Sequence, residues 1–207
     1  MGNWNNYYYK LFFKTKQSCE DFIAFIEAEY AVPYKDYRYE SVLEIEGWTQ
    51  TSELSVEFEI YCKWFRCESV LEILNGKYDL MKGELIVKFE DFWGEPMRKY
   101  IIENGEYDEL ELDFGNIVFD KYRLEDLLVD YYDGDYDKVA KMQEKYEKSC
   151  DSEMNWNEDI CLFLEYYDLD FYKLARLRIT EEQIETFNLE KYVPELFPAE
   201  ISPTPSE

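Results

Sequence analysis

Hydrophobic and polar positions alternate along most of the first two-thirds of the chain, the period of a β-strand with one buried face. Asn104-Gly105 lies between two such segments and is a strong signal for a two-residue hairpin turn. The polar run Thr49-Gln50-Thr51-Ser52 is expected to join an earlier hairpin. The predicted strands cover residues 4–14, 38–48, 53–63, 84–92, 98–103, 107–114 and 117–122.

Apolar residues at helical spacing interrupt this region and dominate after Leu124. Ser18 is expected to cap an early helix that reaches about Tyr30, and Gly76 to end a short helix over 67–75. Four prolines after residue 193 indicate a disordered tail. The later predicted helices begin at Leu124 and cover 135–149, 156–168, 170–178 and 181–188.

These elements predict an α+β fold, with an antiparallel sheet and an early helix in the N-terminal two-thirds and a helical C-terminal third. Residues 1–122 form the mainly β domain. Residues 123–193 form the helical region, which can pack with the first domain as one unit. Residues 194–207 are the tail.

The same alternation places acidic side chains opposite the apolar ones. In residues 107–114, Leu110, Leu112 and Phe114 are expected to face the core, and Glu109, Glu111 and Asp113 to face outward. Residues 53–60 repeat this pattern, as do 38–46 and 84–90. The sequence therefore predicts an outer sheet face rich in carboxylates; in 53–60, Leu54, Val56, Phe58 and Ile60 are expected to oppose Glu53, Glu57 and Glu59.

The net charge of the chain is the main indication of its function. The chain has 47 Asp and Glu against 22 Lys and Arg, a formal charge of −25, whereas solubility needs a net charge of only about 2–8. With 46% hydrophobic and 19% aromatic residues it is not an acidic disordered segment. Residues 103–137 hold thirteen acids and two bases, and 151–170 hold seven acids and no base. Either a basic partner meets this charge, or it is a solvated surface or an adaptation to salt.

Composition also excludes several kinds of chemistry. The chain has no histidine, so Ser-His and Cys-His nucleophile pairs are impossible. Its five scattered cysteines are expected to be reduced thiols of a cytoplasmic protein, and no signal peptide or membrane span is expected. Asp133 to Asp137 only partly match a calcium loop, because Lys138 replaces its glycine. No catalytic residue, metal site or cofactor is predicted.

In charge, length and aromatic content the chain resembles the acidic inhibitors that bacteriophages and mobile elements encode against restriction or CRISPR nucleases, although no family motif supports this. The resemblance implies a non-enzymatic inhibitor that mimics nucleic-acid phosphates. It would block the basic groove of a host nuclease or CRISPR effector without binding nucleic acid itself. Two alternatives are an immunity protein or antitoxin against a basic toxin nuclease, and a metal-dependent enzyme built on carboxylates such as Asp108 and Glu111.

The acidic stretches 103–137 and 151–170 and the outer sheet face are expected to carry partner binding. The individual residues predicted for this surface are Glu53, Glu57, Glu59, Asp108, Glu109, Glu111, Asp113, Asp120, Glu125, Asp126, Asp130, Asp133, Asp135, Asp137, Glu158, Asp159, Glu165, Asp168 and Asp170. The target and the oligomeric state are left open by the sequence.

Overall fold

The chain divides into two compact units, Met1–Leu112 and Asp113–Glu207, which are described separately below. The boundary predicted after residue 122 falls outside the described residues. The computed structural model describes residues 4–35, 40–63, 68–89, 96–118, 124–149 and 169–197.

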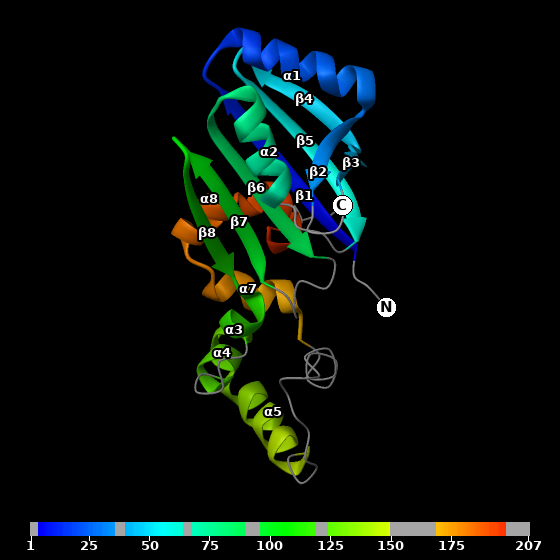
Figure 1. Cartoon of the computed structure of the whole chain (residues 1–207). Helices are drawn as coiled ribbons and strands as arrows, with labels where there is room; N and C mark the ends of the chain where they lie inside the picture. The colour runs from blue at the N-terminus through cyan, green and yellow to red at the C-terminus, as the bar shows by residue number, and fades with distance from the viewer. Residues whose placement is uncertain are drawn as a thin grey trace, which may run out of the picture. The chain divides into compact units, whose positions relative to one another are not determined.

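Unit 1 is an antiparallel sheet with two helices (Figure 1). The six-stranded sheet has the order β4-β5-β1-β6-β7-β8, and β2 and β3 form a separate two-stranded sheet. This confirms the α+β fold class. The elements are β1 (Trp4–Phe13), α1 (Lys16–Glu29), β2 (Ala31–Lys35), β3 (Glu40–Glu44), β4 (Gly47–Ser52), β5 (Ser55–Lys63), α2 (Glu68–Tyr78), β6 (Leu80–Phe89), β7 (Met97–Glu103) and β8 (Glu106–Leu112).

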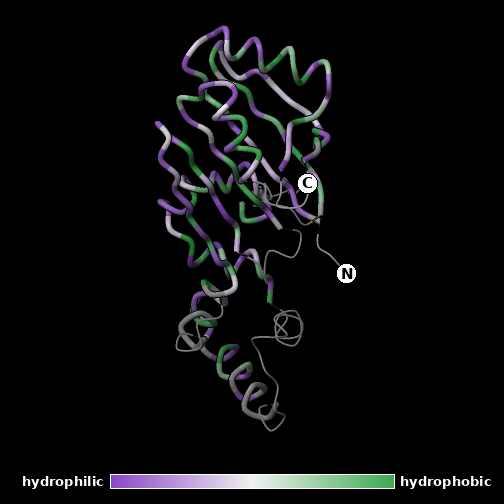
Figure 2. Tube along the Cα trace, viewed as in Figure 1, coloured by the Kyte–Doolittle hydropathy of each residue, from purple (hydrophilic) through white to green (hydrophobic). Residues whose placement is uncertain are grey.

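The core of unit 1 lies between the sheet and the two helices. Alternate residues of the central strands face it. Figure 2 shows hydrophobic and hydrophilic residues interspersed along the chain of this unit. Tyr9 of β1 stacks on Phe58 of β5, with ring centroids 4.6 Å apart. The other buried residues of this core include Tyr7, Leu11, Phe22, Ile26, Val56, Ile60, Val70, Leu71, Leu74, Leu85 and Val87.

Local signals set most element ends, with small corrections. Thr15 rather than Ser18 caps α1, because its Oγ1 accepts the backbone N–H of Ser18 at 3.1 Å. Helix α2 continues past Gly76 to Tyr78, and Asp79, with φ of 52°, follows its end. Asn104 and Gly105 have φ of 52° and 84°, which confirms the predicted two-residue turn between β7 and β8.

The first predicted hairpin is wrong in its pairing. Thr49 to Ser52, expected to form the connection, belong to strand β4, which pairs with β5 through a turn at Glu53 and Leu54. Strand β3 pairs instead with β2. The threonines of β4 favour a strand, which explains the shift. Leu54, expected to face the core, is 40% exposed because it lies in the turn.

Unit 2 is helical. Helices α3 and α4 both pack against α7, around buried Phe114, Leu128 and Leu174. The strand predicted over 117–122 is wrong where it is described, because 117 and 118 belong to α3, and the helix predicted over 156–168 lies outside the described residues. The elements are α3 (Phe114–Val118), α4 (Leu124–Tyr131), α5 (Tyr136–Ser149), α7 (Phe171–Arg178), α8 (Glu181–Phe187), α9 (Leu189–Tyr192) and the 3-10 helix η2 (Pro194–Leu196).

The helices predicted over 135–149, 170–178 and 181–188 are confirmed, with ends within one residue of the prediction, and the helix predicted to begin at Leu124 is α4. Helix α9 and η2 were not predicted. The segment expected to be a tail begins with η2, whose Leu196 is buried, so these first residues pack as part of unit 2.

Candidate partner-binding surface

The sheet face opposite α1 and α2 carries lysines among its carboxylates. The strand register places Glu57, Lys10, Glu84, Ile101 and Asp108 in one row across β5, β1, β6, β7 and β8. We call the side of the sheet on which this row lies the charged face. It is mixed in sign, which corrects the expectation of a face made almost only of carboxylates.

Several carboxylates of the charged face are neutralised within the sheet. Lys10 Nζ lies 2.9 Å from Glu57 Oε1, and Lys99 Nζ lies 3.6 Å from Glu84 Oε2. Lys82 forms a second ion pair with Glu84. Burial acts to raise the pKa of Glu84, but the hydrogen bond from Lys82 and the charges of Lys99, Lys82 and Lys10 outweigh it and lower the pKa. Glu57 and Glu84 therefore form ion pairs that stabilise the sheet, and they are not carboxylates reserved for a partner protein.

Strand β8 is oriented opposite to the prediction. Glu109 lies beside Tyr100 and Glu111 beside Arg98, in rows that continue to Leu85 and Val87 of the core. Their side chains are on the same side of the sheet as α1 and α2, and Leu110 and Leu112 are on the charged face. Alternation shows which residues share a side, but only the register with β7 shows which side it is.

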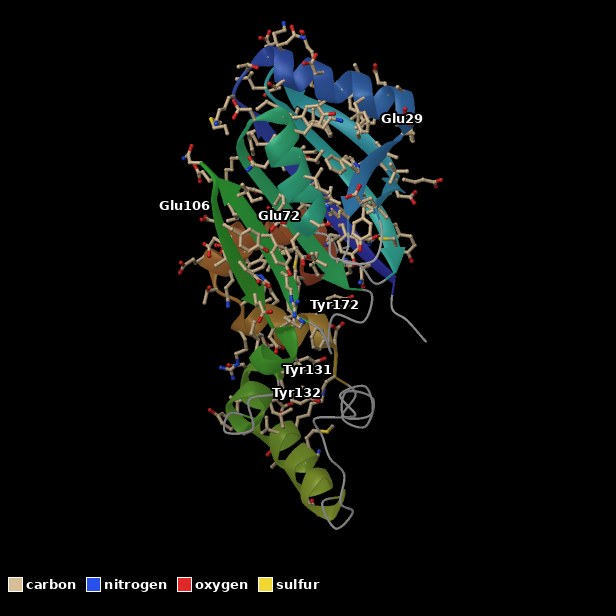
Figure 3. All side chains as sticks on the ribbon, in the orientation of Figure 1. Glu29, Glu72, Glu106, Tyr131, Tyr132 and Tyr172 are labelled. Carbon is tan, nitrogen blue, oxygen red and sulfur yellow. The ribbon has the colours of Figure 1, made fainter. Side chains whose placement is uncertain are left out.

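The β7–β8 hairpin concentrates exposed carboxylates near its turn. Glu103 and Glu106 lie directly opposite each other, and Figure 3 labels Glu106 in this region. Like charges in this arrangement destabilise a strand pair. Tyr107 is 46% exposed between them and the remaining acids. We call the following residues the acidic hairpin: Glu103, Glu106, Asp108, Glu109 and Glu111.

Only one ion pair of the acidic hairpin forms with a described lysine or arginine, between Arg98 Nε and Glu111 Oε1 at 3.0 Å. Glu103 and Glu106 belong to the acidic stretch 103–137 but were not among the individually predicted residues. The signal that identifies them is their position beside the Asn104-Gly105 turn. The other four carboxylates of the acidic hairpin are exposed and form no ion pair with a described lysine or arginine, although the charge of Arg98 also acts on Glu109.

In unit 2 a second acidic group connects α4 and α5. Asp133 has φ of 53° and Gly134 has φ of 79°, so the chain turns sharply here. Asp135 Oδ1 accepts the backbone N–H of Lys138 at 3.1 Å and caps α5, and Asp137 lies in the first helical turn. This is an acidic helix N-terminus. No metal-holding group of three or more His, Cys, Asp or Glu occurs within the described residues.

The other predicted residues are dispersed. Asp130 Oδ2 lies 3.7 Å from Arg178 Nη2, and Asp170 caps α7 by accepting the backbone N–H of Lys173 at 3.0 Å. Glu53 is exposed in the β4–β5 turn, and Glu59 and Asp113 are partly exposed. For Glu125 and Asp126 only the backbone in α4 is described, and outside the described residues lie Asp120, Glu158, Asp159, Glu165 and Asp168.

Comparison of the chain with protein-family models, curated proteins and solved structures gave no match. No helix in the described ranges has the length and apolar character needed to cross a membrane.

Proposed function

We propose that this protein is a non-enzymatic inhibitor whose exposed carboxylates replace nucleic-acid phosphates in the basic groove of a nuclease or CRISPR effector. It acts as a phage anti-defence protein in the host cytoplasm, and its partner is a basic nucleic-acid-binding protein. The observation that carries this proposal is the acidic hairpin, where exposed acids repeat along a strand with no described cation to neutralise most of them.

The spacing of the hairpin suits this role. Residues two apart on a strand lie about 6.6–6.8 Å from each other, as Glu106 and Asp108 do on one side and Glu109 and Glu111 on the other. One DNA strand advances about 3.4 Å per charge along the duplex axis. The carboxylates are therefore spaced on the same scale as the charges of a DNA strand. Most protein contacts to DNA are made with phosphate and sugar, so such a surface needs no imitation of bases.

The partner is identified by pull-down from a lysate of a nuclease-bearing host, followed by inhibition assays on the captured protein. The test variant reverses Glu106, Asp108 and Glu109 to Lys. The matched control reverses Glu27, Glu29 and Glu72, which are exposed on α1 and α2, to Lys, so that the total charge changes equally. Figure 3 labels Glu29 and Glu72.

We expect the hairpin variant to lose inhibition and the helix variant to keep it. Like charges brought together in an interface cost several kcal/mol, which corresponds to at least about a hundredfold in Kd. The complex should also weaken as salt rises and compete with DNA. Equal loss in both variants, or an inhibitory complex that leaves DNA binding intact, contradicts phosphate mimicry.

The second candidate function, an immunity protein or antitoxin, uses the same acidic hairpin against a dedicated toxin nuclease. The two are separated by the captured partner and by the neighbouring genes. Turnover of a substrate that requires Mg²⁺ or Mn²⁺ would instead support an enzyme and overturn both.

A further inference from the structure

Strand β8 is at the edge of the six-stranded sheet, and within the described residues no strand pairs with its outer side. Its register with β7 is continuous from Glu103–Glu106 to Met97–Leu112. In antiparallel pairs the residues alternate between those that exchange both backbone hydrogen bonds and those that do not. In a two-residue hairpin the residues flanking the turn form a bonded pair. The non-bonded positions of β8 are therefore Tyr107, Glu109 and Glu111.

The backbone N–H and C=O groups of these three residues point away from β7, toward the outer edge of the sheet. One hydrogen bond shows this direction independently. The backbone N–H of Glu109 donates to Oδ1 of the adjacent Asp108 at 2.9 Å, so this N–H is not used in the hydrogen bonds between β8 and β7. Tyr107, Glu109 and Glu111 are all exposed. A strand at the edge of a sheet is a template for pairing with another strand.

We propose that β8 binds its partner by strand addition, with a basic extended segment of the partner pairing along Tyr107, Glu109 and Glu111. This rests on the proposed function only in taking the partner to be basic. The chemistry of the added strand follows from β8 itself, which contains four acids and neither Lys nor Arg. These acids project on both sides of the strand, so lysines or arginines on either side of the added segment meet an opposite charge, each such pair contributing roughly 0.2–1 kcal/mol.

The same charges disfavour a second copy of this chain as the occupant. Two β8 strands paired at their edges would place Glu109 and Glu111 of one chain near acids of the other, and like charges across a strand pair are destabilising. In the unbound protein the carboxylate of Asp108 accepts a hydrogen bond from the Glu109 N–H. This is the backbone donor that the added strand would use. Docking exchanges this local hydrogen bond for an interstrand one.

The test compares two substitutions at one position. Glu109→Pro removes the outward N–H without removing a bond to β7, and Glu109→Thr removes the same charge but keeps the N–H. The probe is a labelled nine-residue peptide alternating lysine and valine, and its affinity for the full chain is measured by fluorescence anisotropy. We expect the Thr variant to bind within about threefold of wild type and the Pro variant to lose at least about tenfold, more than 1.4 kcal/mol.

A second measurement does not depend on how the Pro variant folds. The same peptide N-methylated at every residue keeps its charge but has no backbone N–H to donate from either edge, and we expect it not to bind. Amide hydrogen exchange should slow at Tyr107 and Glu111 when the unmodified peptide is bound. Equal binding of the methylated peptide, or equal affinity of the Pro and Thr variants, would overturn strand addition. Self-association of the protein that Glu109→Pro abolishes would also overturn it, by identifying a second copy as the occupant.

The proposed function and strand addition fail separately. If peptide binding does not distinguish Pro from Thr but reversing Glu106, Asp108 and Glu109 abolishes nuclease inhibition, strand addition is overturned and phosphate mimicry stands. If the peptide binds along β8 but the protein inhibits no nuclease, the proposed function is overturned and strand addition stands.

Discussion

Neutralising Glu84 should destabilise unit 1, although the chain as a whole has a large excess of negative charge. In Glu84→Gln the shape of the side chain is kept and the charge is lost. Lys82 and Lys99 then lose the carboxylate that both contact. Their side chains are 32% and 13% exposed, and that of Glu84 is 19% exposed, so water replaces the lost contacts only in part.

The expected cost follows from this partial burial. Exposed ion pairs contribute about 0–1 kcal/mol, and removing one partner of a fully buried pair costs about 3–5 kcal/mol. Hydrogen bonds to charged groups are worth about 1.5–3 kcal/mol. Glu84 lies between the two extremes of exposure, so we expect Glu84→Gln to lower the free energy of unfolding by about 2 kcal/mol.

The assay is denaturant unfolding at pH 7, with Glu106→Gln as the matched control. Glu106 is exposed, has no described cationic partner and faces Glu103, so its neutralisation should change stability by less than about 0.5 kcal/mol or slightly increase it. If Glu84→Gln also changes stability by less than about 0.5 kcal/mol, the conclusion that the charged face is internally paired is refuted.

The pH dependence provides a second check. The pKa of Glu84 is below its ordinary value of 4.5 in the folded protein, because its lysine partners outweigh the opposing effect of burial. Its stabilisation is therefore fully present above pH 4.5 and is lost as the pH falls from there through the lower folded-state pKa. The difference between wild type and Glu84→Gln should shrink over that range, and a constant difference would contradict the assignment.

Three further substitutions or reactions test the fold. Burial raises the pKa of Cys62 to about 12 from an ordinary 9.0, so iodoacetamide should alkylate it at least about tenfold more slowly than an exposed thiol at pH 8, because the smaller thiolate fraction outweighs the higher nucleophilicity of that thiolate; rapid modification located by mass spectrometry would contradict this burial. A Cβ at Gly83 would lie 2.5 Å from Leu71 Cδ1, so Gly83→Ala should cost about 1–3 kcal/mol in denaturant unfolding, and an unchanged midpoint would show that α2 is not this close. Thr180 and Gln183 form a capping box on α8; Thr180→Ala should cost about 1 kcal/mol, and a smaller effect than that of an exposed control substitution would exclude the cap.

Local pattern was sufficient for much of the sheet. The alternation of Val56, Phe58 and Ile60 correctly predicted a buried side of β5, because residues two apart on a strand share one side of the sheet. The Asn104-Gly105 turn was predictable for a similar reason, since positive φ is required there and these residues adopt it readily.

Pairing was less predictable because it depends on distant segments. Nothing within residues 38–48 indicates that β3 pairs with β2, or that the threonines after it continue as β4. The mixed charge of the sheet was missed for the same reason. Lys10 and Glu84 are far apart in sequence and become neighbours only through the register of β1 with β6.

The ion pairs of the charged face do not change the net negative charge of the chain. They determine in which part of the sheet the carboxylates without a cationic partner lie. Even if every one of the 22 lysines and arginines neutralises one carboxylate, 25 of the 47 acids still have no cationic partner. Lys10, Lys82 and Lys99 lie on β1, β6 and β7, so the ion pairs of the charged face that the structure describes are concentrated near the middle of the sheet. The edge strand β8 has acids and no base. Protection of an edge against aggregation needs charge of either sign. Binding of a basic partner, by contrast, requires that the charges at the edge are all negative, as they are in β8. The uniform sign of these charges therefore favours a binding role for β8 over edge protection alone.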